Sequence, residues 1–178
     1  MKADKPLTVV SNSTPLIYLA KIGRLSIIRN VFEKIFIQEA VFEEAVIRGK
    51  ALNMSDAHII ERAVGTWIIK ERIRQEIDAE YRFLDTNTRL GSGEKEAIKL
   101  CKQINAKYLI ADDKEARRVS KMLSITPIGT CSIIIQAYKQ KAITKNEAVQ
   151  IMDDLLKVGF RINPELYCRI LHELEFQR

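Results

Sequence analysis

Short apolar runs alternate with helical segments along this chain, and this alternation constrains its fold more than any other feature. β-branched runs bounded by turn residues are typical of buried strands. Helices between successive strands favour βαβ units, and hence a mainly parallel sheet covered on both faces. The expected strands are 7–10, 34–37, 67–69, 107–111 and 125–128. The expected helices are 16–22, 24–30, 38–48, 55–65, 71–84, 94–104, 114–123, 130–140, 144–157 and 164–175, with a loop at 85–93.

Composition supports one globular domain over residues 1–178. Apolar residues make up 47% of the 178 residues, with 7 Gly and 4 Pro, which argues against a disordered or fibrous chain. No apolar run approaches the roughly 20 residues needed to span a bilayer, and the charged N-terminus does not resemble a signal peptide. We therefore expect a cytoplasmic protein without membrane contact.

The supply of titratable residues favours carboxylate chemistry. Only 3 Cys and 2 His are present, and the cysteines lie far apart, which argues against a zinc site or a disulfide framework. The net charge of +6 favours an anionic partner such as nucleic acid, although a scattered basic excess is also common on ordinary surfaces.

Polar residues follow two of the expected strands. Residues 11–14 follow the first strand, where Ser13 or Thr14 is expected to cap the next helix ahead of Pro15, and Asp112 and Asp113 follow the fourth strand. In parallel α/β sheets, sites lie beyond the carboxyl ends of the strands. One aspartate would suffice as a helix cap, so the pair also indicates a site at this edge.

Helical periodicity selects two glutamates that face inward. Glu94 falls in the same arc as the apolar residues Ala97, Ile98, Cys101 and Ile104. Glu44 falls in the arc of Val41, Ala40, Ala45 and Ile47, whereas Glu43 and Glu39 lie on the polar side. Two plainer roles stay open: a first-turn glutamate stabilised by the helix dipole for Glu94, and an ion pair with Arg48 for Glu44.

The inward set consists of oxygen ligands alone: Asn12, Glu44, Glu94, Asp112 and Asp113. Hard cations such as Mg²⁺ or Mn²⁺ prefer such ligands. A carboxylate site of this kind suits hydrolysis of a phosphodiester, with surrounding Lys and Arg holding the nucleic-acid backbone. A phosphoryl-handling domain is a weaker alternative, because the first strand ends in Asn rather than in an acidic nucleophile. No phosphate-binding loop of the Walker type is present.

Several segments in order resemble the PIN domain superfamily, in particular its archaeal and bacterial PIN-like subfamily whose sequences begin with an SDTSPLI-like motif. The matching segments are 9–17, 38–44, 90–98, 109–118, 129–130 and 158–162. The resemblance implies a three-layer α/β/α sandwich with a central, mainly parallel sheet. It also implies Mg²⁺- or Mn²⁺-dependent ribonuclease activity, often as the toxin of a toxin–antitoxin pair, with RNA as substrate, an antitoxin protein as partner and a homodimer as assembly.

The same resemblance assigns roles by position. Glu44, Glu94 and Asp113 would be catalytic and metal-binding, with Asp112 and Asn12 as further ligands. Ser13 or Thr14 would support the first ligand. Asn12 departs from the pattern, since Asp is expected there. Asparagine keeps a carbonyl oxygen but lacks the charge. The alternative hypothesis is therefore a catalytically impaired PIN-like protein that binds nucleic acid or an antitoxin.

Overall fold

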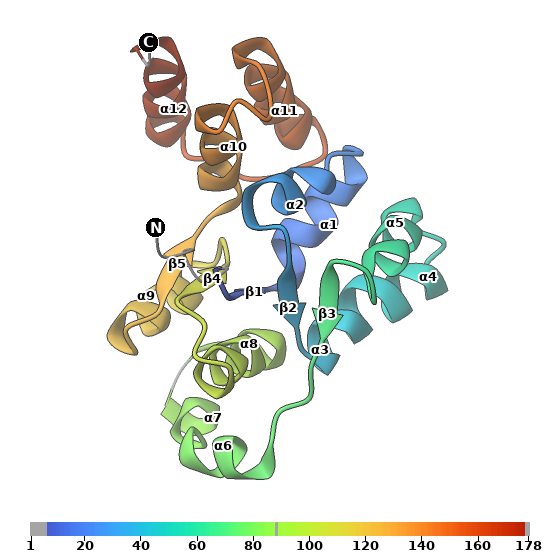
Figure 1. The fold of residues 1–178 in the computed structure, drawn as a ribbon, viewed down its shortest axis with the longest axis vertical. Coiled ribbons are helices and arrows are strands. Elements are labelled where there is room, and N and C mark those ends of the chain that lie inside the picture. The colour runs from blue at the N-terminus through green and yellow to red at the C-terminus, as the bar shows by residue number, and fades with distance from the viewer. Residues whose placement is uncertain (1–6, 88, 177–178) are drawn as a thin grey trace, which may run out of the picture.

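A five-stranded, entirely parallel sheet forms the centre of the protein, as described by a computed structural model for residues 7–87 and 89–176 (Figure 1). The strands are β1 (Val9–Ser11), β2 (Ile35–Ile37), β3 (Ile68–Lys70), β4 (Tyr108–Ile110) and β5 (Thr126–Ile128). Their order is β3-β2-β1-β4-β5. β5 contains Pro127 and lies at an edge, where a missing backbone donor costs no central hydrogen bond.

Helices cover both faces of the sheet, which confirms the predicted three-layer sandwich. One core lies beneath α1 (Ser13–Lys21), α2 (Ser26–Phe32), α3 (Glu39–Phe42), η1 (Glu43–Arg48), α5 (Ser55–Ala63), α10 (Thr130–Lys139), α11 (Lys145–Lys157) and α12 (Pro164–Phe176). The other lies beneath α7 (Phe83–Asn87), α8 (Ser92–Gln103) and α9 (Lys114–Met122). The short α4 (Gly49–Ala51) packs on α5, and α6 (Gln75–Glu80) packs on α8.

The alternation of side chains along the strands divides residues between the two cores. Val9 and Ile110 enter the core beneath α1 and α10, whereas Val10 and its neighbour across the ladder, Leu109, enter the core beneath α8 and α9. Successive residues of a strand point to opposite faces. The side chains that directly follow each strand also alternate between the two faces, and this alternation decides which helix they contact.

The first helix begins earlier than the sequence predicts. Asn12 is the N-cap of α1, and its Oδ1 accepts a hydrogen bond from the backbone N–H of Ser13 at 2.9 Å. Ser13 and Thr14 are therefore helical residues and not the cap. Pro15 still lies in the first turn, where its missing N–H costs nothing.

The stretch between β3 and α8 differs most from the prediction. The expected helix 71–84 is two short helices, α6 and α7, and α7 extends into the expected loop 85–93. The fully buried Leu84 anchors α7, and the Lys99 side chain of α8 binds Asp78 and Asp85 at 2.7 and 3.0 Å. These contacts come from tertiary packing, which periodicity does not report. Part of the predicted loop, residue 88, lies outside the described residues.

Within residues 7–87 and 89–176, no helix combines the length and the apolar character that crossing a membrane requires.

Candidate active site

The candidate site lies where the chain leaves the carboxyl ends of β1, β2 and β4. Asn12 follows β1, Gln38 follows β2, and the pair Asp112 and Asp113 follows β4 after one residue. These strands are neighbours in the sheet, so the polar residues after them lie along one edge. The edge faces the start of α8, which carries Gly93 and Glu94.

Asn12, Ser13 and Glu44 form the centre of this site. Asn12 is only 5% exposed, and Ser13 is also buried. The Ser13 hydroxyl donates a hydrogen bond of 2.8 Å to Oε2 of Glu44. The predicted inward direction of the Glu44 carboxylate is therefore present, although the residue as a whole is exposed. Thr14, one residue further, is half-buried.

The helix that carries Glu44 is not the regular α-helix that its apolar spacing predicts. Residues 43–48 form the π-helical turn η1. Ile47, expected on the buried face, is 44% exposed, while Val46 is fully buried. A π turn holds more residues than an α turn, so the rotation per residue is smaller and the buried face shifts. The Glu44–Arg48 ion pair, left open as the plainer alternative, does not occur among the described residues.

Gly93 leaves a small space between the oxygens of Asn12 and Glu44. A Cβ atom built on Gly93 would lie 3.7 Å from Asn12 Oδ1 and 3.7 Å from Glu44 Oε2. Any larger side chain would fill the space between these two oxygens. The backbone carbonyl of Gly93 is held from the other side by Gln38, whose Nε2 donates a hydrogen bond of 2.6 Å.

Glu94 contributes the second carboxylate of the site. Its Oε2 accepts a hydrogen bond of 2.8 Å from the backbone N–H of Gly91, at the start of α8. Burial raises the pKa of Glu94, and the negative charges of Asp113 and Glu44 raise it further, against the opposing effect of the Gly91 hydrogen bond. We name Glu44, Glu94 and Asp113 the acidic cluster, because the charges of Glu44 and Asp113 act on the Glu94 carboxylate.

Asp112 and Asp113 face different helices. Asp113 caps α9, its Oδ1 accepting from the backbone N–H of Ala116 at 2.8 Å, and its charge acts on Glu94. Asp112 accepts from the Thr130 backbone N–H at 2.8 Å and the Thr130 hydroxyl at 2.6 Å. Burial raises the pKa of Asp112, while the Thr130 hydrogen bonds and Arg117 act in the opposite direction. Asp112 thus caps α10 from a neighbouring strand, since the N-cap residue Gly129 has no side chain.

We predict that Asp112→Ala destabilises the protein by about 2 kcal/mol, because it leaves the buried Thr130 donors without their acceptor. Asp113→Ala removes only an exposed helix cap and should cost about 1 kcal/mol. Urea unfolding of both variants measures the difference. An equal or greater loss in Asp113→Ala would contradict the assigned cap of α10.

The donor set of this site fits a hard divalent cation. All its groups are oxygen donors, and a space bounded by Asn12 Oδ1 and Glu44 Oε2 lies at Gly93. Burial and the charges of Asp113 and Glu44 raise the pKa of Glu94, and a cation would offset this effect. Across residues 7–87 and 89–176, no three His, Cys, Asp or Glu side chains are close enough to hold an ion by themselves. Hydrated Mg²⁺, which keeps several waters and needs one or two carboxylates, suits this arrangement.

Gln38 and Gly93 belong to the site but escape the sequence analysis. Gln38 is fully buried, and its Oε1 is the buried side-chain atom without a hydrogen-bond partner among the described residues. The rule that selected Asn12 and Asp112, a polar residue after a strand, also applies to Gln38. Gly93 carries no comparable signal, because its importance depends on which oxygens lie opposite it.

Comparison with known proteins identifies one family. The family model described as DUF3368, a PIN domain, matches residues 8–175. No curated protein and no solved structure matches the chain. The match covers all five strands and the whole candidate site.

Proposed function

Because the chain belongs to the PIN domain family, whose fold is of a nuclease type, we propose that it is a metal-dependent RNA endonuclease. The single observation that carries this proposal is the arrangement at the start of α8. There Asn12, Glu44 and Glu94 gather around Gly93, and the charge of Asp113 reaches Glu94. Metal-assisted hydrolysis of a phosphodiester uses such a concentration of negative oxygen ligands around a cation.

The proposed cofactor is Mg²⁺ or Mn²⁺. Glu44, Glu94 and Asp113 would hold the ion, and Asn12 would add a neutral oxygen. Once bound, the cation would offset the charge that develops on the scissile phosphate and make water more acidic. In the hydrolysis a water oxygen would bond to phosphorus as one P–O bond breaks, and the leaving oxygen would take up the proton that the water loses.

The residues around the cation have separate tasks. Ser13 orients Glu44 through its 2.8 Å hydrogen bond, and Gln38 fixes the Gly93 backbone through its 2.6 Å hydrogen bond. Glu94 is anchored by the Gly91 N–H, which limits the rotation of its carboxylate. The surplus of Lys and Arg outside the cluster would neutralise the phosphates that flank the cleaved one.

A second candidate function follows from Asn12. An amide at this position supplies one negative charge fewer than an aspartate, so cation affinity would be weaker. The protein would then bind RNA or an antitoxin without cutting RNA. A role as toxin with an antitoxin partner, and a homodimer, belong to the nuclease proposal and rest on the family resemblance, whereas the proposed cytoplasmic location rests on the sequence alone.

Adjacent glutamates allow a matched test of the nuclease proposal. We predict that Glu44→Gln lowers the rate of Mn²⁺-dependent cleavage of mixed RNA by at least about 100-fold, because it weakens the binding of the ion. Glu43→Gln, the same change one residue earlier at an exposed position, should leave the rate unchanged. The measurement is the rate of cleavage on denaturing gels.

Two results would count against the nuclease. Cleavage that is equal in wild type and Glu44→Gln would remove the acidic cluster from the reaction. Absence of cleavage in wild type, with retained RNA binding, would favour the second candidate function.

A further inference from the structure

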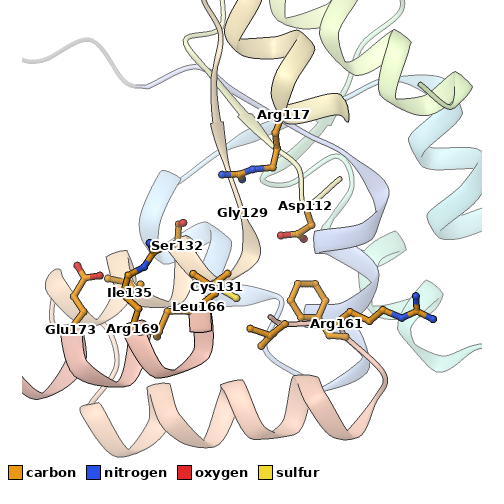
Figure 2. Close-up of a pocket in the computed structure, with 13 residues that line it drawn as sticks. Asp112, Arg117, Gly129, Cys131, Ser132, Ile135, Arg161, Leu166, Arg169 and Glu173 are labelled. Carbon is orange, nitrogen blue, oxygen red and sulfur yellow. The ribbon is translucent and has the colours of Figure 1, made fainter. Parts of the chain in front are cut away.

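A pocket of about 330 Å³ is lined by Asp112 but by no residue of the acidic cluster (Figure 2). It is enclosed by the end of β5, the start of α10, and α12 with the segment before it. Its lining comprises Asp112, Arg117, Gly129, Cys131, Ser132, Ile135, Phe160, Arg161, Ile162, Leu166, Arg169, Ile170 and Glu173. We name it the arginine pocket, after Arg117, Arg161 and Arg169.

The three arginines reach the pocket from three parts of the fold. Arg117 comes from α9, Arg169 from α12, and Arg161 from the segment before α12, and Figure 2 shows them on different sides of the pocket. Arg161 and Arg169 are exposed and form no salt bridge within the described part of the chain. The nearby Glu173 is neutralised by Lys139 at 2.5 Å. Positive charge is therefore available on the rim.

The lining of the pocket combines apolar and polar side chains and includes Asp112. The half-buried Ile135, Ile162 and Leu166 contribute apolar surface, whereas Phe160 and Ile170 are almost fully buried. Gly129 keeps the wall open, since a Cβ there would lie 3.1 Å from both Arg117 Nη1 and Asp112 Oδ1. Arg117 is held in place by a hydrogen bond of 3.1 Å to the carbonyl of Ala111. Apolar side chains with arginines on either side suit a ligand that has a flat, apolar part next to anionic groups.

We propose that the arginine pocket binds one nucleotide of single-stranded RNA, with the phosphates on its two sides on Arg161 and Arg169 and its base between them, against Ile135, Ile162 and Leu166. This inference rests on the proposed function and extends it to substrate binding. Asp112 lines the pocket, whereas the next residue, Asp113, acts on Glu94 in the acidic cluster. The pocket and the acidic cluster therefore flank the same chain segment after β4, and an RNA strand bound at one could extend to the other.

The experiment measures RNA binding without cleavage. A fluorescein-labelled, single-stranded oligouridylate is titrated with the full chain in EDTA, and anisotropy is recorded at several salt concentrations. For Arg161→Gln/Arg169→Gln we expect Kd to rise about tenfold and the slope of log K against log salt to fall by about 1.4, because two phosphate contacts are lost. Both residues are exposed, so the fold should be retained.

A charge-matched variant and three competitors complete the test. Arg62→Gln/Arg82→Gln removes two exposed arginines on elements far from α12, and it should leave Kd within about twofold. Uridine monophosphate should displace the RNA better than inorganic phosphate at equal ionic strength. An equal loss in both double variants, equal competition by phosphate, or better competition by polyglutamate would overturn the nucleotide assignment. Because cleavage plays no part in this assay, a failure of the nuclease proposal would not imitate a failure of the pocket.

Discussion

Asn12→Asp should strengthen Mn²⁺ binding by about 10- to 100-fold and raise the rate of RNA cleavage at low Mn²⁺. The change replaces a neutral oxygen by a carboxylate beside Glu44. A full unit charge 4 Å from a cation contributes up to about 4 kcal/mol at an effective dielectric constant near 20, and retained water reduces this. Isothermal calorimetry with Mn²⁺ measures the affinity directly.

The same substitution should lower stability in the absence of metal. Position 12 is 5% exposed and close to Glu44, so an added carboxylate suffers both desolvation and repulsion. Thermal unfolding should therefore show a lower Tm for Asn12→Asp in EDTA and a larger Mn²⁺-dependent rise than in wild type. Asn12→Ser, which keeps a capping oxygen without the charge, is the control. Equal Mn²⁺ affinity in wild type and Asn12→Asp would contradict a cation site at this position.

Glu94→Gln should reduce cleavage by at least about 100-fold and yet stabilise the protein. Glutamine retains an oxygen that can accept the Gly91 hydrogen bond, but it removes a carboxylate that is partly buried and repelled by Asp113 and Glu44. Glu94 is partly open to solvent, which screens the repulsion, so the expected rise in Tm is about 1–2 °C.

The stabilisation should depend on pH in a defined direction. The pKa of Glu94 is raised in the folded state, so the cost of ionising it is complete above that raised pKa. As the pH falls below the pKa of the unfolded chain, the side chain is protonated in both states and the cost disappears. The Tm difference between Glu94→Gln and wild type should therefore shrink on acidification.

Glu96→Gln is the control for this pair of effects. Glu96 lies on the same helix, but its Oε2 accepts a hydrogen bond from the Ala40 N–H at 3.4 Å, and it is not among the charges that raise the pKa of Glu94. The control should keep wild-type cleavage and show no acid-sensitive gain in Tm. A gain of the same size in Glu96→Gln would mean that general helix propensity, rather than repulsion at the site, causes the effect.

The layered architecture could be predicted because strands and helices leave different apolar periods in the sequence. Each of the five strands was expected within about two residues of its observed position. The stretch from 71 to 93 was predicted poorly, because α6 and α7 are held by Lys99 and Leu84 through contacts distant in sequence. This stretch is rich in charged residues, and its few apolar residues form only a weak helical stripe.

The candidate site could be predicted in part. Periodicity selected Glu44 and Glu94, and the strand-end rule selected Asn12 and the aspartate pair. The direction of Glu44 was expected from a regular helix, whereas the structure achieves it in a π-helical turn that buries Val46 and exposes Ile47. The inward direction of the Glu44 carboxylate was thus predicted from a helix geometry that does not occur.

By itself, the sequence determined the sheet and its helical layers, because these depend on apolar periods of two and 3.6 residues. It also determined that carboxylates gather at one edge of the sheet, because this depends on the residue types that follow the strands. Only the tertiary structure separated Asp112 from Asp113, since the choice depends on which helix lies on each side of β4. It also placed Gly93 between the oxygens of Asn12 and Glu44. It brought Arg117 to the same pocket as Arg161 and Arg169, which follow it by more than forty positions in the sequence. Packing brings residues that are distant in the sequence close together in space, and local sequence patterns carry no information about this packing.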